Sequence, residues 1–380
     1  MADLVVVSGS LAQQPGRGGH AWVFLQYLLG FRRLGYDVLF LDRLAADMRP
    51  AGETFPPREP VEWLRETMAA HGLEDDYCLL LEGEDGRDTV GLSRAEALER
   101  VGRSTLLLDV MGFLGDEELL AAAPRRVFLD IDPGFPQMWQ QLGLHRSFGD
   151  HDAYATVGLR VGKEGSRVPT CGVEWVPTPP PVVLDEWPRT APGEAWTSIA
   201  TWRGPFGPIE FEGETFGLRA HQMRRFAKLP AAIDTPLELA LDIDPADAAD
   251  SESLRNGGWR LVAPSEAAGS PQAYRRYLQG SRGEIGVAKD MYVRSRGGWL
   301  SDRSVAYLAA GKPVVAQATG FETEIETGAG LLAFGNPEEA AAALAEVEGD
   351  YKRHSDAARE LAAERFGSDR VLGELMEAVA

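Results

Sequence analysis

Short apolar runs of strand length alternate with helical patterns along nearly the whole chain of 380 residues. Residues 4–7 form such a run, and residues 20–36 then repeat apolar side chains at helical spacing up to a glycine-containing stop. Apolar strands separated by helices are typical of parallel sheets that carry helices on both faces. The sequence therefore predicts an α/β protein built from doubly wound, Rossmann-like sheets.

A proline-rich segment interrupts this alternation near the middle of the chain, at residues 173–194. Segments rich in proline are semi-rigid spacers, and 380 residues exceed one ordinary core. We expect an N-terminal domain (1–172), a hinge (173–194), a second domain (195–365) and a C-terminal helix (366–380). This last helix could pack back on the N-terminal domain. Two such domains would face a central cleft at the carboxyl ends of their strands, where open α/β sheets bind ligands.

Charge is distributed unevenly along the chain, whose formal net charge is −20. This acidity argues against general nucleic-acid binding and against adhesion to anionic membranes. Between residues 282 and 312, however, six basic residues outnumber three acidic ones: Arg282, Lys289, Arg294, Arg296, Arg303 and Lys312 against Glu284, Asp290 and Asp302. A small anionic ligand bound in this region would explain the local excess, and chance surface charge is the alternative.

The segment 297–316 has the features of an anion site at the start of a helix. Ser301 is a good N-cap, and the amides of Asp302, Arg303 and Ser304 would then be free to donate to a ligand. The guanidinium of Arg303 can hold phosphate oxygens in pairs. The alternative is an ordinary capped helix with Arg303 on the surface.

The run SDRSVAYLAAGKPVVAQATGF, at 301–321, resembles the donor-binding region of GT-B glycosyltransferases, most closely the bacterial family 1 or spore-protein-like group. The resemblance implies the GT-B fold and metal-independent transfer of a sugar from a nucleoside-diphosphate sugar, UDP- or TDP-linked, to an acceptor hydroxyl or another nucleophile. Many retaining members carry two glutamates where this chain has Gly298 and Ala306. Asp302 would then take part of the role of binding the donor ribose, and inversion or retention stays open.

The same resemblance implies further donor contacts in the second domain. Arg203 and Gly204 follow its first predicted strand and would face the diphosphate, with Lys289 as a second cation. Leu261 and Val262 would offer backbone groups to the nucleotide base. Arg203 could instead be a surface arginine in a salt bridge, and Leu261 and Val262 could simply belong to a buried strand.

The N-terminal domain would supply the acceptor site and the base. In inverting members a histidine at the start of the first helix, here His20, withdraws the acceptor proton, and imidazole suits this role because its pKa lies near the working pH. A carboxylate would orient the ring, with Asp109 and Asp132 as candidates. His20 could instead cap the helix or contact phosphate. The residues expected at the acceptor are Gly18, Gly19, Asp132 and Phe135.

Several classes of site are not expected. The Asp130 and Asp132 pair is better explained as a strand end followed by a turn than as a metal site, and no Cys/His spacing suggests a metal. Two cysteines and the lack of a signal-peptide pattern favour the cytoplasm. We expect small-molecule partners only, no permanently bound cofactor, no membrane insertion, and a monomer or homodimer active in natural-product or glycan biosynthesis.

Two other functions are compatible with the predicted architecture. A sugar-nucleotide 2-epimerase would need carboxylates around the sugar, which Glu322, Glu324 and Glu326 could supply. A non-catalytic nucleotide-sugar-binding protein would keep the cleft and lack the base.

Overall fold

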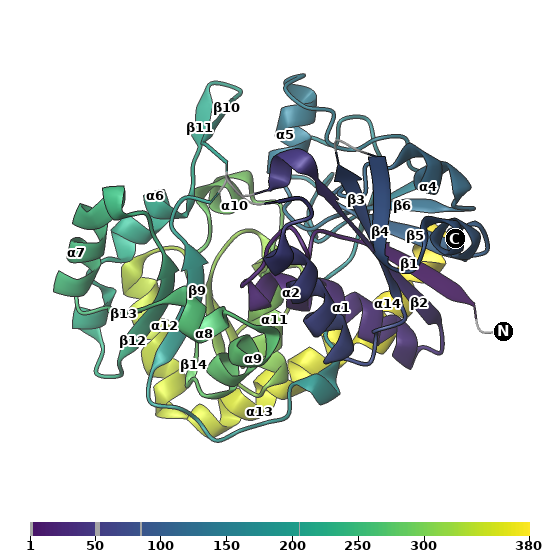
Figure 1. Ribbon diagram of the computed structural model, residues 1–380. Helices are drawn as coiled ribbons and strands as arrows, with labels where there is room; N and C mark the ends of the chain where they lie inside the picture. Colours follow the sequence, from purple (N-terminus) through teal and green to yellow (C-terminus); the bar gives the residue numbers. More distant parts are fainter. Residues whose placement is uncertain (1–2, 50–53, 84–85, 205) are drawn as a thin grey trace.

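The chain forms two α/β domains that lie side by side, each built around its own sheet (Figure 1). The computed structural model describes residues 3–49, 54–83, 86–204 and 206–380. Within these residues no helix is both long enough and apolar enough to cross a membrane.

The N-terminal sheet has eight strands in the order β4-β3-β2-β1-β5-β6-β7-β8. Neighbouring strands are parallel, except that β4 runs antiparallel to β3 at one edge. The strands are β1 (Leu4–Ser8), β2 (Asp37–Ala45), β3 (Tyr77–Gly83), β4 (Gly86–Gly91), β5 (Leu106–Val110), β6 (Arg126–Asp130), β7 (Ala153–Thr156) and β8 (Trp175–Pro177). The helices are α1 (Gly18–Arg33), α2 (Arg58–Ala69), α3 (Arg94–Gly102), α4 (Glu117–Ala122) and α5 (Phe135–Gln141).

The C-terminal sheet has six parallel strands in the order β13-β12-β9-β14-β15-β16. The strands are β9 (Trp196–Thr201), β12 (Leu237–Asp242), β13 (Arg260–Val262), β14 (Gly283–Gly286), β15 (Val314–Gln317) and β16 (Leu331–Phe334). The helices are α6 (Arg219–Met223), α7 (Ala248–Asn256), α8 (Pro264–Ala268), α9 (Pro271–Gln279), α10 (Asp290–Ser295), α11 (Asp302–Ala309), α12 (Pro337–Gly349) and α13 (Tyr351–Leu361). A last helix, α14 (Ser368–Val379), follows and returns to the first domain. The predicted fold class, two doubly wound domains facing a cleft, is confirmed.

A hairpin replaces the loop expected after β9. Strands β10 (Ile209–Phe211) and β11 (Glu214–Phe216) pair antiparallel and turn through two residues with positive φ, Glu212 and Gly213. The apolar side chains of the hairpin pack with Phe135 of α5, so this insertion reaches across to the N-terminal domain. The prediction of a loop here was wrong because alternation over only three residues on each side of a turn gives a weak signal.

The chain crosses between the domains twice, and the two crossings lie against each other. The amide of Val182 donates to the carbonyl of Phe366, and the amide of Ser368 donates to the carbonyl of Val182. After the second crossing α14 packs on α1, where Gly30 lets the helices approach closely. A Cβ at Gly30 would lie 2.5 Å from the side chain of Leu372. The last helix therefore belongs to the core of the N-terminal domain.

Candidate functional site

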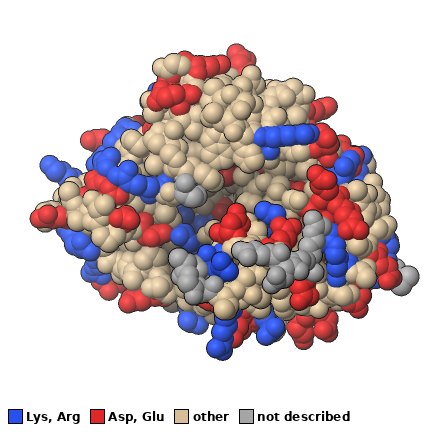
Figure 2. All heavy atoms as spheres, turned by 45° about the horizontal axis from the view of Figure 1, so that its top comes forward, with Lys and Arg blue, Asp and Glu red and all other residues tan. Residues whose placement is uncertain are grey.

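A cavity of about 590 Å³ lies between the two domains. Its walls are the segment from β1 to α1, the carboxyl ends of β9 and β12, and the first residues of α6, α8 and α11. Figure 2 looks onto this region, where the surface is hollowed and basic side chains lie inside the hollow. Ligands of open α/β sheets bind at such strand ends.

Of the residues expected at the start of α11, Arg303 lines this cavity, and its guanidinium is engaged by protein groups. The Ser301 hydroxyl caps the helix by accepting from the amide of Arg303 at 3.2 Å. The guanidinium of Arg303 donates from Nε to Glu284 at 2.5 Å and from Nη1 to the carbonyl of Ile199 at 2.8 Å. Ser301, Arg303 and Ser304 also line a smaller, water-sized cavity at the end of β14. Arg303 therefore has fewer donors left for a phosphate than its position in the sequence suggests.

The other two predicted cations are also paired. Arg203 binds Asp247 through two nitrogens, with Nε 2.7 Å from the carboxylate, and its side chain is exposed at the edge of the cavity. Lys289 lies 2.9 Å from Asp132 of the N-terminal domain, which also accepts from the hydroxyl of Tyr292. Both cations line the cavity, as does Gly204. A bound anion would have to compete with these carboxylates.

Arg219, which no sequence motif singles out, is the cavity-lining cation without such a partner among the described residues. It is 8% exposed, lines the cavity, and donates from Nη1 to the carbonyl of Val287. Among the described residues it forms no ion pair. Burial lowers its pKa to about 10, and the nearby charge of Arg303 adds to this effect. Glu284 and Asp132 attract this charge without forming an ion pair with it. A buried charge without a direct anionic partner is costly, so this position favours an anionic ligand.

His20 stands in the first turn of α1 and lines the same cavity. Its Nε2 lies 3.0 Å from the Ser10 hydroxyl and 3.2 Å from the Ser10 carbonyl. Because a carbonyl only accepts, we assign the ring proton to Nε2, which leaves Nδ1 as the basic atom. Burial lowers the pKa of His20 to about 4, so the ring is neutral at pH 7.

Neither carboxylate predicted to orient His20 contacts it. Asp109 is buried, accepts from Ser8 at 2.6 Å and lies 3.1 Å from Nε2 of His151. Asp132 is engaged with Lys289. The expected histidine–carboxylate pair was therefore wrong, since within the described chain the hydrogen-bond partner of the His20 ring is Ser10.

The glycines before His20 serve packing as well as the cavity. A Cβ at Gly18 would lie 2.1 Å from the carbonyl oxygen of Ser270, where α1 meets α9. Gly19 lines the cavity against Tyr274. The close approach of the two domains explains Gly18 without an acceptor.

The expected base-binding strand lies slightly off the cavity. Leu261 and Val262 are in β13, the edge strand of the second sheet, and are not among the described residues that line the cavity. Pro264 and Ser265, which follow them, do line it. The segment is thus at the carboxyl end of the sheet as expected, but the residues that line the cavity lie three positions further along the chain.

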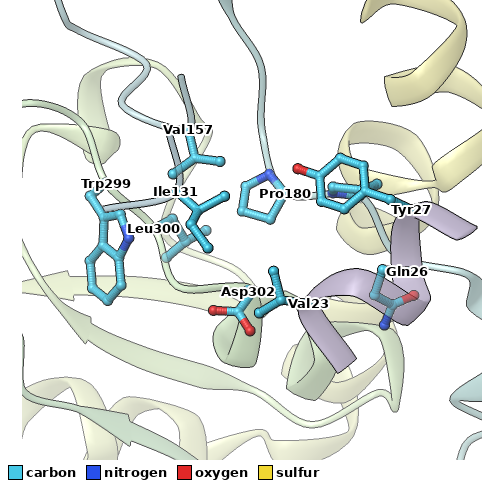
Figure 3. A pocket seen from close by; sticks show the side chains of 10 residues that line it. Val23, Gln26, Tyr27, Ile131, Val157, Pro180, Trp299, Leu300 and Asp302 are labelled. Carbon is cyan, nitrogen blue, oxygen red and sulfur yellow. The ribbon is translucent and has the colours of Figure 1, made fainter. Parts of the chain in front are cut away.

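Asp302 faces a second cavity of about 40 Å³ between the domains (Figure 3). This cavity is mostly apolar, and its lining residues are Val23, Gln26, Tyr27, Ile131, Val157, Pro180, Pro181, Trp299, Leu300 and Asp302. Burial raises the pKa of Asp302, and the hydroxyl of Ser301 lies 3.4 Å from its carboxylate. The side chain lies beside Val23 of α1, and Asp302 is not among the described residues that line the cleft cavity (Figure 3).

The glutamates considered for epimerisation lie outside the cleft cavity. Glu322 pairs with Arg296, and Glu324 pairs with Arg160 and Lys163. None of the three lines the described cavity. This placement gives no support to an epimerase.

No family model and no curated protein matches the sequence. Solved structures do match along nearly the full length. HepE (Alr3699) of Anabaena, in complex with UDP-glucose, has a TM-score of 0.59 at 12% identity and covers 99% of this chain and 98% of its own. An α-glucosyltransferase in complex with UDP and a 13-mer DNA has a TM-score of 0.58 at 13% identity, with 100% of both chains covered.

The chain has the GT-B fold. Sucrose-phosphate synthase of Thermosynechococcus elongatus shares it, with a TM-score of 0.55 at 11% identity over 99% of this chain and 98% of the other. At these identities the likeness concerns the fold alone. Within this GT-B fold, the cleft cavity brings together His20 from the first domain and Arg203, Arg219, Lys289 and Arg303 from the second.

Proposed function

We propose that the protein is a glycosyltransferase that uses a nucleoside-diphosphate sugar, with a UDP-sugar as the first candidate and a TDP-sugar as the second. The observation that carries the proposal is Arg219, a buried guanidinium without an ion-pair partner in the described chain, facing a cavity of suitable size. The structural neighbours HepE and the α-glucosyltransferase were solved with UDP or UDP-glucose, which supports a uridine nucleotide.

In this proposal the diphosphate lies against Arg219 and the N-terminus of α11. As the bond between the anomeric carbon and the diphosphate oxygen breaks, the electron pair goes to that oxygen. Fixed cations at the site stabilise the charge that develops there. Lys289 can contribute once the phosphate has displaced Asp132, and no metal ion is needed.

His20 is the proposed base if the reaction inverts the anomeric centre. The acceptor oxygen forms the new bond to the anomeric carbon, and its proton passes to Nδ1 of His20. A base with a pKa near 4 is weak, but a bound diphosphate places negative charge beside the ring and raises its pKa. The transferred group is proposed to be a hexosyl unit.

The test is a thermal-shift titration with UDP, dTDP and GDP on wild type, Arg219→Gln and Arg203→Gln. A ligand that binds only the folded state raises the melting temperature. We expect UDP or dTDP to stabilise wild type and Arg203→Gln, and to lose about tenfold or more in affinity for Arg219→Gln. Equal stabilisation of both variants by UDP, or no stabilisation of wild type by any nucleotide, would contradict the proposal.

A further inference from the structure

Three aromatic side chains, Phe135, Trp139 and Phe206, form a cluster beside the mouth of the cleft, which we call the aromatic rim. Phe135 and Trp139 come from α5 of the first domain, and Phe206 comes from the segment between β9 and β10 of the second. Phe206 is 40% exposed, which is unusual for a large apolar side chain in this protein. In Figure 2 the face that carries α5 and the hairpin includes a broad area without charged side chains.

The three rings contact one another across the domain boundary. The rings of Trp139 and Phe206 meet edge to face, with centroids 4.6 Å apart and planes at 76°. Phe135 lies 5.7 Å from Trp139 and 5.8 Å from Phe206. The rim is therefore complete only when the two domains are close together.

The rim is continuous with the cleft cavity. The ammonium of Lys289, which lines the cavity, lies 5.0 Å from the centre of the Phe135 ring. Gly204, two positions before Phe206, lines the cavity as well. A molecule resting on the rim can thus extend a group into the space where the sugar would be transferred.

The polar groups of the rim are few. The indole N–H of Trp139 makes no hydrogen bond within the described chain, so it remains available to a ligand. A saccharide acceptor would need several carboxylates or amides to bind its hydroxyls, whereas the rim offers rings and one donor. Aromatic faces bind flat rings through stacked or edge-to-face contacts.

We propose that the aromatic rim binds the acceptor, and that the acceptor is an aromatic compound whose hydroxyl reaches into the cleft. This inference rests on the proposed glycosyltransferase function and names the substrate class of the same site. A membrane surface is the less favoured occupant, because the chain carries a net charge of −20 and the rim adjoins the cavity.

The first test is direct binding in the presence of saturating UDP, measured by calorimetry. The probes are 4-methylumbelliferone, 4-nitrophenol and 2-naphthol, with methyl α-D-glucoside as a non-aromatic comparison. The variants are Phe206→Ala, Trp139→Ala and Trp139→Phe, which keeps a ring and loses the N–H. Leu144→Ser is the matched control, because Leu144 is 70% exposed near the rim and contributes no ring.

We expect at least one aromatic probe to bind wild type and to lose about tenfold in affinity in Phe206→Ala and Trp139→Ala, with a smaller loss in Trp139→Phe. Leu144→Ser should stay within about twofold of wild type. UDP should stabilise all variants equally, which shows that they fold and keep the donor site.

Unchanged affinity in both alanine variants with UDP binding intact would overturn the inference and leave the proposed function standing. So would tighter binding of methyl α-D-glucoside than of every aromatic probe. Binding to phosphatidylcholine vesicles that is lost in Leu144→Ser would assign the patch to a lipid surface instead. Failure of every nucleotide to stabilise wild type would reject the proposed function, and the inference with it.

Discussion

Asp132 of the N-terminal domain and Lys289 of the C-terminal domain form an ion pair of 2.9 Å at the wall of the cleft. Each side chain is about one-quarter exposed, and the hydroxyl of Tyr292 also donates to Asp132. The pair connects the two domains at the place where a donor phosphate is proposed to bind. The carboxylate therefore competes with the ligand for the ammonium group.

Asp132→Asn should tighten UDP binding, because Lys289 is then no longer neutralised. We expect a gain of roughly three- to tenfold, which calorimetry at low and moderate salt would measure. Glu324→Gln is the matched control, since Glu324 also links the domains, through Arg160 and Lys163, without lining the cavity. Equal gains in both variants would point to looser domains rather than to a released lysine.

The stability of the protein should depend on pH through His20. Its pKa is about 4 in the folded state and near 6.5 when the chain unfolds, so the unfolded state takes up the proton first as the pH falls. The stabilising contribution is thus complete above pH 6.5 and is lost between about pH 6.5 and 4. It should amount to roughly 1–3 kcal/mol, toward the lower end because the ring is only partly buried.

Urea unfolding at pH 7.5 and pH 5 would measure this difference for wild type and His20→Gln. The variant should lose less stability on acidification than wild type. His145→Gln, which removes an exposed histidine, provides the control. Identical pH slopes in wild type and His20→Gln would contradict the assignment.

Replacing His20 should separate catalysis from donor binding. His20→Ala should lower kcat by about 10²- to 10⁴-fold while the affinity for UDP stays within about twofold. Asp109→Asn should instead lower stability and keep kcat within a few-fold, because Asp109 holds Ser8 and His151 and makes no contact with His20. Turnover and UDP affinity measured on both variants would decide this, and a large kcat loss in Asp109→Asn would restore the histidine–carboxylate pair.

Gly18→Ala should destabilise the protein by about 2 kcal/mol or more, because the added methyl group meets the carbonyl of Ser270 at 2.1 Å. The control is Gly373→Ala in α14, where nothing lies within 4 Å of the new Cβ. This second change should be neutral or stabilising by up to about 1 kcal/mol. Thermal unfolding of both variants would measure the contrast, and a neutral Gly18→Ala would show that the domains can separate at this point without cost.

The fold could be predicted because apolar runs of strand length are local signals. The buried strands β1, β5 and β15 are each recognisable from a largely apolar run of four or five residues. The edge strand β4 and the β10–β11 hairpin were missed, since short half-exposed strands carry little periodic pattern. The excess of basic residues between 282 and 312 could be read from the sequence. Its place beside the cleft could be predicted from the alternation of strands and helices, because the carboxyl ends of parallel strands meet at one edge of the sheet.

The pairing of side chains could not be predicted in the same way. In sequence, Arg303 and Arg219 are both arginines close to the start of a helix, and Arg303 has the more suggestive neighbours. Only the folded chain brings Glu284 to Arg303 and leaves Arg219 with a carbonyl as its partner. Likewise Asp109 and His151 are in direct contact although they lie 42 positions apart, and no rule of sequence spacing relates two such positions.

The paired crossings at Val182 and Phe366 bear on how the molecule can open. Two hydrogen-bonded segments that connect the same two domains form a hinge. They permit bending at the crossings and oppose rotation of one domain against the other. The domains are connected by two segments rather than one, and α14 holds the second segment in place by packing on α1 of the N-terminal domain. We therefore expect the two domains to move relative to each other by bending at these paired segments, because the hydrogen bonds between the crossings oppose their independent movement.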